Sequence, residues 1–136
     1  MSLQVVEQYV DQINAHSIED IVRLMTGDHL FVDSLGQAIR GREAMRRAWL
    51  TYFEWMPDYR IDVEQKFERD SIVGLFGRAS GTCAVGGELR EENRWAIPAA
   101  WRAVVRDGLV AEWQVYADNK PVYEIMSRDP KLGGSG

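Results

Sequence analysis

The stretch DHLFVDSLGQAIRGREAMRRAW (residues 28–49) predicts a strand, a turn and a helix in succession. Its LFV run favours a strand, DSLG is typical of a turn, and REAMRRAW carries apolar residues at helical spacing. Because side chains alternate along a strand, His29, Phe31 and Asp33 share one face. A carboxylate beside an aromatic side chain is a candidate general base in an apolar pocket. The alternative is that Asp33 caps the turn, which is a common use of aspartate.

The composition predicts one folded domain that does not bind nucleic acid. The chain has 136 residues, of which 46% are hydrophobic, enough for a single domain with its own core. The net charge is −5, whereas nucleic-acid binding needs a basic surface. No apolar run approaches the roughly 20 residues that cross a bilayer. We expect no membrane association, and because no signal peptide is visible, we expect a cytoplasmic protein.

One cysteine and two histidines limit the redox and metal chemistry of the chain. Cys83 has no disulfide partner, and its strand-like surroundings favour a small buried residue over a nucleophile. His16 and His29 lack the spacing of zinc motifs. We therefore expect no metal site and no organic cofactor.

Hydrophobic periodicity predicts helices in the first part of the chain and strands in the second. The expected helices cover residues 3–15, 18–25 and about 41–56, and Pro57 ends the last of them. From Tyr59 the apolar period changes to two, which predicts strands up to the turn at 69–70 and over 71–84, 89–105 and 109–117. Pro98 inside the third of these strands predicts a bulge or a bend.

The order of these elements predicts an α+β domain. We expect a cone in which three N-terminal helices pack on a strongly bent, mostly antiparallel sheet, with a cavity between the two layers. A short helix over 122–126 should follow the last strand, with Pro121 in its first turn. The domain should cover residues 1–127, with a flexible tail over 128–136. The cavity is the default ligand site.

Four segments resemble the nuclear transport factor 2-like (NTF2-like) superfamily, in particular its SnoaL-like and ketosteroid isomerase-like branches. They are VVEQYVDQINAHSIEDIVRLM, HLFVDSLG, GREAMRRAW and VVRDGLVAEWQVYADNKPV, and the resemblance covers about residues 3–125. It implies the cone-shaped fold and a homodimer packed through the sheet face. The activity stays open, because this superfamily contains isomerases, cyclases, hydrolases, dehydratases and binding proteins.

The ketosteroid isomerase pattern matches the chain at two positions. The resemblance places its catalytic tyrosine on Tyr9 and its general base on Asp33. Its second oxyanion-hole residue, a carboxylic acid, falls on Ala99 or Ala100. The resemblance therefore implies a base and one hydrogen-bond donor without the second donor.

Two other branches also match incompletely. The limonene epoxide hydrolase pattern retains Asp118 but has Ser80 where its second acid is expected, and the SnoaL-type cyclase pattern has Gln114 at its acid position. Taken together, the patterns give Asp33 and Tyr9 as candidate catalytic residues. The candidate substrate-binding residues are Phe31, Trp49, Phe53, Gln114, Tyr116 and Asp118.

Two classes of function are open from the sequence. In the first, Asp33 removes a proton next to a carbonyl of a small hydrophobic molecule while Tyr9 stabilises the enolate, as in an isomerase or cyclase. In the second, the cavity binds a lipophilic ligand, or the open sheet face binds a partner chain, without catalysis. The enzyme hypothesis requires Tyr9 and Asp33 to point into one cavity.

Overall fold

The computed structural model describes residues 2–128, which contain four α-helices and six strands. The helices are α1 (Ser2–Asn14), α2 (Ile18–Arg23), α3 (Arg42–Trp55) and α4 (Lys120–Arg128). The strands are β1 (Met25–Val32), β2 (Ala38–Arg40), β3 (Arg60–Arg69), β4 (Ile72–Thr82), β5 (Arg94–Arg106) and β6 (Leu109–Ala117). A 3₁₀ turn, η1 (Glu91–Asn93), precedes β5. Except for Arg128, the predicted tail over 128–136 lies outside the described residues.

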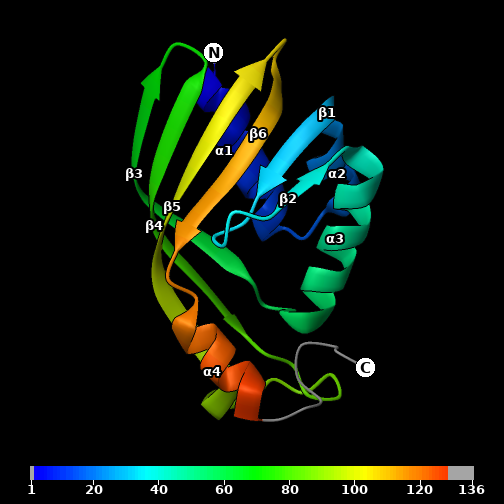
Figure 1. The fold of residues 1–136 in the computed structure, drawn as a ribbon, viewed down its shortest axis with the longest axis vertical. Helices are drawn as coiled ribbons and strands as arrows, with labels where there is room; N and C mark the ends of the chain where they lie inside the picture. Colours follow the sequence, from blue (N-terminus) through cyan, green and yellow to red (C-terminus); the bar gives the residue numbers. More distant parts are fainter. Residues whose placement is uncertain (1, 129–136) are drawn as a thin grey trace.

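The strands form one mixed sheet in the order β2-β1-β6-β5-β4-β3. All neighbours are antiparallel except β1 and β6, which run parallel, with Phe31 opposite Trp113. This parallel pair joins the first strand of the chain to the last (Figure 1). The predicted α+β class and the mostly antiparallel sheet are confirmed.

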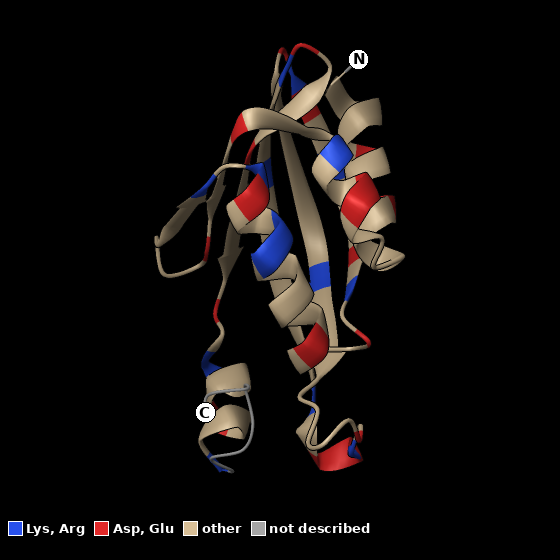
Figure 2. Ribbon diagram, turned by 90° about the vertical axis from the view of Figure 1, so that its right-hand side faces the viewer, with Lys and Arg blue, Asp and Glu red and all other residues tan. Residues whose placement is uncertain are grey.

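The helices are distributed unevenly over the sheet. Helix α1 passes behind the sheet and contacts β3, β4, β5 and β6, whereas α3 contacts β1 and β2 (Figure 1). Helix α4 lies beyond the end of β6. Within the described residues, no helix covers the face of β3–β6 that is turned towards the viewer in Figure 1. Acidic and basic residues are interspersed along the helices in the view of Figure 2.

The core lies between the helices and the inner face of the sheet. Helix α1 contributes a stripe at helical spacing, with Val6, Tyr9 and Ile13 fully buried. Trp101 of β5 and Trp113 of β6 are the largest fully buried side chains, and their rings stack with centroids 6.4 Å apart. Burial of such aromatic side chains is a major source of stability in a domain of this size.

Two sequence predictions about element boundaries need correction, and so does the bulge that was one of the two effects expected of Pro98. The second helix ends at Arg23, because Met25 pairs with Val110 and begins β1. Residues 91–93 form a 3₁₀ turn and not part of a strand. Pro98 causes no bulge: it lies opposite Arg78 in an uninterrupted β4–β5 ladder, and β6 pairs with β5 only from Ala99 onwards. The proline is therefore tolerated where β5 has one neighbouring strand.

The predicted turn between the last two strands is confirmed. Asp107 and Gly108 both have positive φ, 54° and 73°. Two successive residues in this conformation make the type of two-residue hairpin loop that matches the twist of the strands. This loop sets the pairing of Val105 with Val110, and a shift of one residue after this pair places Ala103 opposite Trp113.

Candidate functional site

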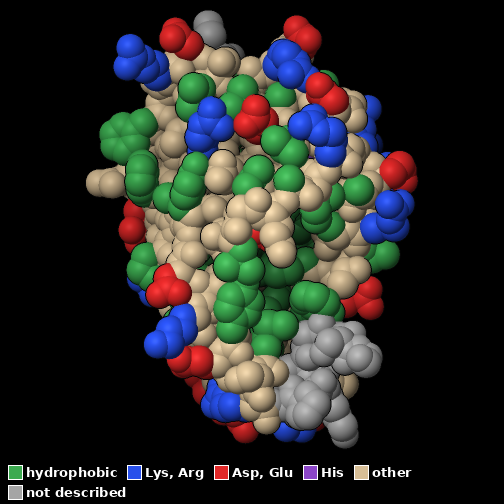
Figure 3. All heavy atoms as spheres, viewed as in Figure 1, with side chains coloured by type: hydrophobic (Ala, Val, Ile, Leu, Met, Phe, Trp, Pro, Cys, Tyr) green, Lys and Arg blue, Asp and Glu red, His purple; other side chains and the backbone are tan. Residues whose placement is uncertain are grey.

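A pocket of about 700 Å3 lies between α3, α4 and the sheet, and we call it the α3–α4 pocket. In Figure 3, hydrophobic side chains gather around a hollow in the lower half of the molecule, between the positions of these two helices in Figure 1. Its aromatic lining consists of Phe31, Trp49, Tyr52, Trp55, Tyr59, Trp95, Trp113 and Tyr123. Such a pocket has the size and character of a small-molecule site.

The secondary structure explains why these rings converge. On α3, Met45, Trp49 and Tyr52 recur at intervals of four and three and face the sheet. On β5 and β6, every second residue faces the helices, which brings Trp95 and Trp113 to the same side. The rings also contact one another: the centroids of Tyr52 and Tyr59 are 5.0 Å apart at 85°. The wall is thus built from mutually supporting aromatic side chains.

Small side chains create the space inside this wall. Ala48 of α3, Ala79 of β4, Ala99 of β5 and Ala117 of β6 all line the pocket. Larger residues at these inward positions would fill the volume between the two layers. The hollow therefore depends on alanines on four different elements.

Asp33 lies at the pocket and also holds the turn that follows β1. Its Oδ1 accepts hydrogen bonds from the backbone N–H groups of Leu35 and Gln37, each at 2.9 Å. Within residues 2–128, its Oδ2 accepts no hydrogen bond, and the half-buried side chain lines the pocket. The position of Asp33 is therefore compatible with both interpretations from the sequence, a cap of the turn and a carboxylate in the pocket.

The structure does not place Tyr9 in the lining of this pocket. Its ring is fully buried against Trp113, with centroids 5.0 Å apart, and its hydroxyl has no hydrogen-bond partner among residues 2–128. Burial raises the pKa of Tyr9, so the hydroxyl stays protonated. The indole nitrogen of Trp49 lies near the Tyr9 hydroxyl and partly offsets the increase in pKa. The geometry of the indole nitrogen and the hydroxyl is nevertheless not that of a hydrogen bond. The requirement that both Tyr9 and Asp33 line one pocket is not met.

Of the predicted substrate-binding residues, only Phe31 and Trp49 line the pocket. Gln114 and Tyr116 alternate with Trp113 and Val115 along β6, so they lie on the opposite face of the sheet. Both residues therefore lie outside the lining of the α3–α4 pocket.

Phe53 and Asp118 are also outside the pocket lining. Phe53 is turned towards the end of α1, where its ring stacks on His16 with centroids 3.9 Å apart. Asp118 follows β6, and its Oδ1 accepts a hydrogen bond from the backbone N–H of Lys120 at 3.0 Å. Asp118 therefore begins α4 in the manner of a helix cap.

Some lining residues were not selected from the sequence. Trp95 and Tyr59 belong to the wall, and Arg47 and Asn119 also line the pocket. The alternation of β5 was a usable signal for Trp95, because this residue shares the face of the buried Trp101. No comparable pattern marks Asn119, which lies in the short connection between β6 and α4.

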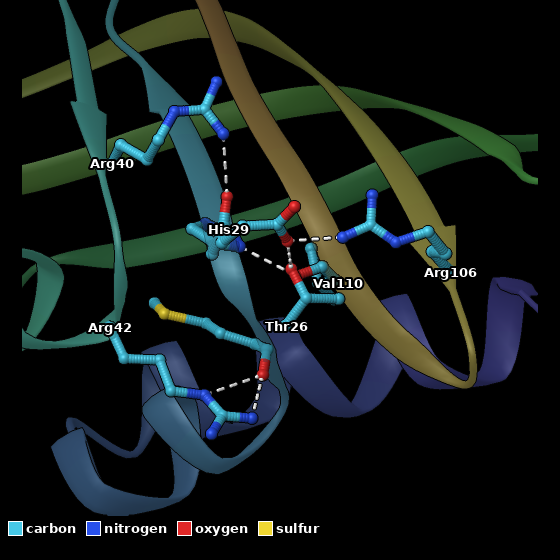
Figure 4. A network of polar contacts seen from close by, with 8 residues as sticks. Thr26, His29, Arg40, Arg42, Arg106 and Val110 are labelled. Atoms are coloured by element: carbon cyan, nitrogen blue, oxygen red, sulfur yellow. Dashed lines mark hydrogen bonds and ion pairs between the residues drawn. The ribbon is translucent and has the colours of Figure 1, made fainter.

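His29 lies on β1 beside a network of polar contacts that joins β1 to Arg40, Arg42, Arg106 and Val110 (Figure 4). The ring of His29 is fully buried, and its Nδ1 lies 2.7 Å from the carbonyl oxygen of Val110. Burial lowers the pKa of His29, although the Val110 carbonyl and the carboxylates of Asp28 and Glu112 favour the protonated ring. Within the part of the chain that the structure describes, the His29 Nε2 has no hydrogen-bond partner.

The remaining chemistry of the described residues is limited. Among residues 2–128, no group of three His, Cys, Asp or Glu side chains is arranged to hold a metal ion. Cys83 is buried, and this burial raises the pKa of its thiol. None of the described helices is long and apolar enough to cross a membrane.

The fold and its pocket define an α+β domain of the NTF2-like class, with N-terminal helices on a six-stranded mixed sheet. The family model of the SnoaL-like domain matches residues 6–113, and the chain therefore belongs to the SnoaL-like domain family. No curated protein matches the sequence.

Several solved structures share this fold. One, from Jannaschia sp. CCS1, has a name that proposes a SnoaL-like polyketide cyclase; it is 21% identical, with a TM-score of 0.81 over 95% of this chain and 93% of that chain. A protein from Shewanella denitrificans OS-217, with a name that proposes the same activity, is 14% identical, with a TM-score of 0.80 over 94% and 98%.

A hypothetical protein from Catenulispora acidiphila DSM 44928 has a ketosteroid isomerase-like fold and was solved in complex with trimethylamine. It is 14% identical to this chain, with a TM-score of 0.78 over 93% of this chain and 95% of that chain. At these levels of identity, the similarity establishes the fold and not the activity.

Proposed function

We propose that the protein binds a small, flat, largely apolar molecule in the α3–α4 pocket, which a bent sheet and the helices enclose. The observation that carries this proposal is the aromatic wall around about 700 Å3 of space. Ligand pockets commonly measure about 300–1,000 Å3 and have mainly apolar walls with a few polar groups. Rings on opposite sides of the pocket can contact both faces of a planar ligand.

A small number of polar side chains accompany this wall. Asp33 and Arg47 are the charged residues that line the pocket within the described part of the chain. Arg47 is exposed and forms no ion pair there, and Asn119 donates a hydrogen bond to Ser34 at 2.6 Å. Polar groups of this kind can orient a ligand whose apolar body occupies the aromatic part.

Catalysis at Asp33 is the second candidate function. The observation that favours it is that Asp33 lines the pocket while its Oδ2 accepts no hydrogen bond from the described residues. A carboxylate in this position can remove a proton next to a carbonyl, as in a cofactor-independent isomerase or cyclase. The names of the Jannaschia and Shewanella proteins agree with such chemistry. Binding is the better supported function, because it needs only the aromatic wall and no second catalytic group beside Asp33.

The binding proposal is tested by filling the pocket. Ala117→Leu places three extra carbons in the lining, whereas Ala96→Leu adds the same atoms on the exposed face of β5 as a matched control. With 2-methylnaphthalene as the probe in calorimetric titration, Ala117→Leu should weaken binding by about tenfold or more, from overpacking of about 1–3 kcal/mol. Absence of binding to the wild type, or equal affinities in both variants, would contradict the proposal.

We also propose that the protein is a homodimer that packs through the outer face of β3–β6. Phe76, Ala100 and Tyr116 are directly opposite one another across β4, β5 and β6. The side chains of Phe67 and Phe76 are 59% and 48% exposed, and their rings meet with centroids 5.9 Å apart. Contiguous apolar surface of this kind commonly belongs to a protein interface.

The oligomeric state tests this second proposal. Phe76→Arg should shift the protein to a monomer in sedimentation velocity, because it places a charge in the centre of the apolar row. Leu50→Arg is the matched control, since Leu50 is similarly exposed, at 54%, but lies on α3. A wild-type monomer at high concentration would contradict the proposal.

A further inference from the structure

We propose that His29, Tyr9 and Trp49 form a binding site for a ligand hydroxyl group at the inner end of the α3–α4 pocket. This inference rests on the proposed binding function and specifies the chemical class of the ligand as a planar phenol or enol. It is carried by three unpaired polar atoms that come from three different elements.

The first step is the position of His29 relative to the pocket. His29 shares one face of β1 with Phe31 and Asp33, both of which line the pocket. Along this face the side chains pass from the half-buried Asp33 to the fully buried His29. His29 therefore follows Phe31 on the way into the interior, on the side of the sheet that carries the pocket.

The second step is the proton on the His29 ring. A carbonyl oxygen can only accept, so the contact with Val110 at 2.7 Å requires Nδ1 to carry a hydrogen. Burial lowers the pKa of His29 below its ordinary value, which favours the neutral ring, and a neutral imidazole has one N–H group. Its Nε2 is therefore a hydrogen-bond acceptor, and it is buried without a donor.

The third step is the presence of two buried donors nearby. The rings of Tyr9 and His29 have centroids 6.1 Å apart, and the protonated Tyr9 hydroxyl has no partner. The indole N–H of Trp49 is also buried without a partner, although the Trp49 ring lines the pocket. Buried polar groups in native proteins are nearly always paired, so these three atoms need an explanation, as does Trp101 Nε1, the fourth such atom among the described residues.

Among common ligand groups, a hydroxyl is best suited to form hydrogen bonds with these atoms. It can donate its hydrogen to the His29 Nε2 and accept hydrogen bonds from the Tyr9 hydroxyl or the Trp49 indole. A ketone or an ether can only accept, and would leave His29 unpaired. Since Tyr9 and His29 lie behind the present lining, a lining side chain must move for the hydroxyl to reach them.

Two probes of matched shape test this inference. Calorimetry with 2-naphthol and 2-methylnaphthalene compares a hydroxyl with a methyl group on the same ring system, and the ratio of the two affinities is the readout. His29→Asn keeps a side-chain N–H for the Val110 carbonyl but removes the acceptor at the Nε2 position. It should lower the preference for 2-naphthol by about five- to tenfold, which is the worth of one hydrogen bond.

Two further variants complete the experiment. Tyr9→Phe removes only an unpaired hydroxyl, so it should fold normally and lower the same preference by about three- to tenfold. His16→Asn is the control, because His16 lies outside the pocket lining and its positive φ of 56° suits asparagine. Its affinity ratio should equal that of the wild type.

The outcomes separate this inference from the proposed function. If both probes bind but the ratio is unchanged in His29→Asn and Tyr9→Phe, the hydroxyl site is wrong and the pocket proposal stands. If neither probe binds the wild type, both proposals are wrong. A ratio that falls in the two variants and not in His16→Asn supports both.

Discussion

The inner and outer ends of β1 place two polar side chains in contrasting situations. Asp33 at the outer end is half buried, and its carboxylate already accepts two backbone hydrogen bonds. His29 at the inner end is fully buried, and its Nε2 has no partner. The fold alone accounts for an aspartate at position 33, because the carboxylate supports a turn. An unpaired buried acceptor destabilises the fold, so a ligand is the better explanation for the inner end.

The largest expected effect on stability comes from replacing His29, the buried one of these two residues. His29→Leu deletes the donor to the Val110 carbonyl and should lower the free energy of unfolding by about 1–3 kcal/mol, as expected for a buried unpaired group. Urea denaturation measures the change. His29→Asn should recover most of the loss, because its amide can still donate. A His29→Leu protein as stable as the wild type would show that this hydrogen bond does not hold the ring.

A smaller effect should appear in the pH dependence of stability. The pKa of His29 is lowered from its ordinary value of 6.5, chiefly by burial. Below pH 6.5 the unfolded chain therefore takes up a proton before the folded chain does, and stability falls as the pH drops towards the folded pKa. Asp28 acts in a separate range, because its carboxyl pKa is lowered from 3.8, first by a hydrogen bond from Thr26. Urea titrations between pH 7.5 and 5 should show the loss.

His29→Asn provides the control for this pH effect, because asparagine does not titrate. The slope of stability against pH between these limits should decrease in the variant. An unchanged slope would indicate that the pKa of His29 is the same in the folded and the unfolded chain. An increased slope would indicate that the histidine is protonated in the folded protein, and Nε2 would then be a donor and not an acceptor.

Changes at Asp33 should have the smallest effect on stability. Asp33→Ala removes the acceptor for the N–H groups of Leu35 and Gln37, and should cost about 1 kcal/mol, because water can replace these bonds in an exposed turn. Asp33→Asn should stay within about 0.5 kcal/mol of the wild type, since asparagine serves the same turn. A large loss in Asp33→Asn would show that the charge itself stabilises the fold.

The same Asp33→Asn protein tests the catalytic candidate. For a substrate that the wild type converts, turnover should fall by about 10²- to 10⁴-fold when the base is removed, with little change in melting temperature. Full activity in Asp33→Asn would contradict a role for Asp33 as general base.

The class and order of the elements could be predicted from the sequence because they depend on local patterns. The change of period after Pro57 separates helices from strands, and helical spacing identifies α1 and α3. The pairing of β1 with β6 could not be predicted this way, because its partners, such as Phe31 and Trp113, are far apart in sequence. The error at Met25 has the same origin: its apolar side chain fits a helix end until pairing with Val110 is known.

The candidate site could be predicted only in part. The alternation of side chains along β6 defines two faces of the strand, but it does not show which face lines the pocket. Gln114 and Tyr116 belong to the face that is turned away from the pocket. Helical spacing places Tyr9 in the interior, yet it does not show whether a hydroxyl reaches open space. The importance of His29 depends on an unpaired Nε2, which appears only when every neighbouring group has a position.

A crystal structure of the protein with 2-naphthol tests the central claim most directly, because it shows which end of the pocket the hydroxyl occupies. We expect the ring system between α3 and the sheet, and the hydroxyl oxygen about 2.6–3.2 Å from both the His29 Nε2 and the Tyr9 hydroxyl. A naphthol bound with its hydroxyl at Asp33, or bound outside the α3–α4 pocket, would contradict the account.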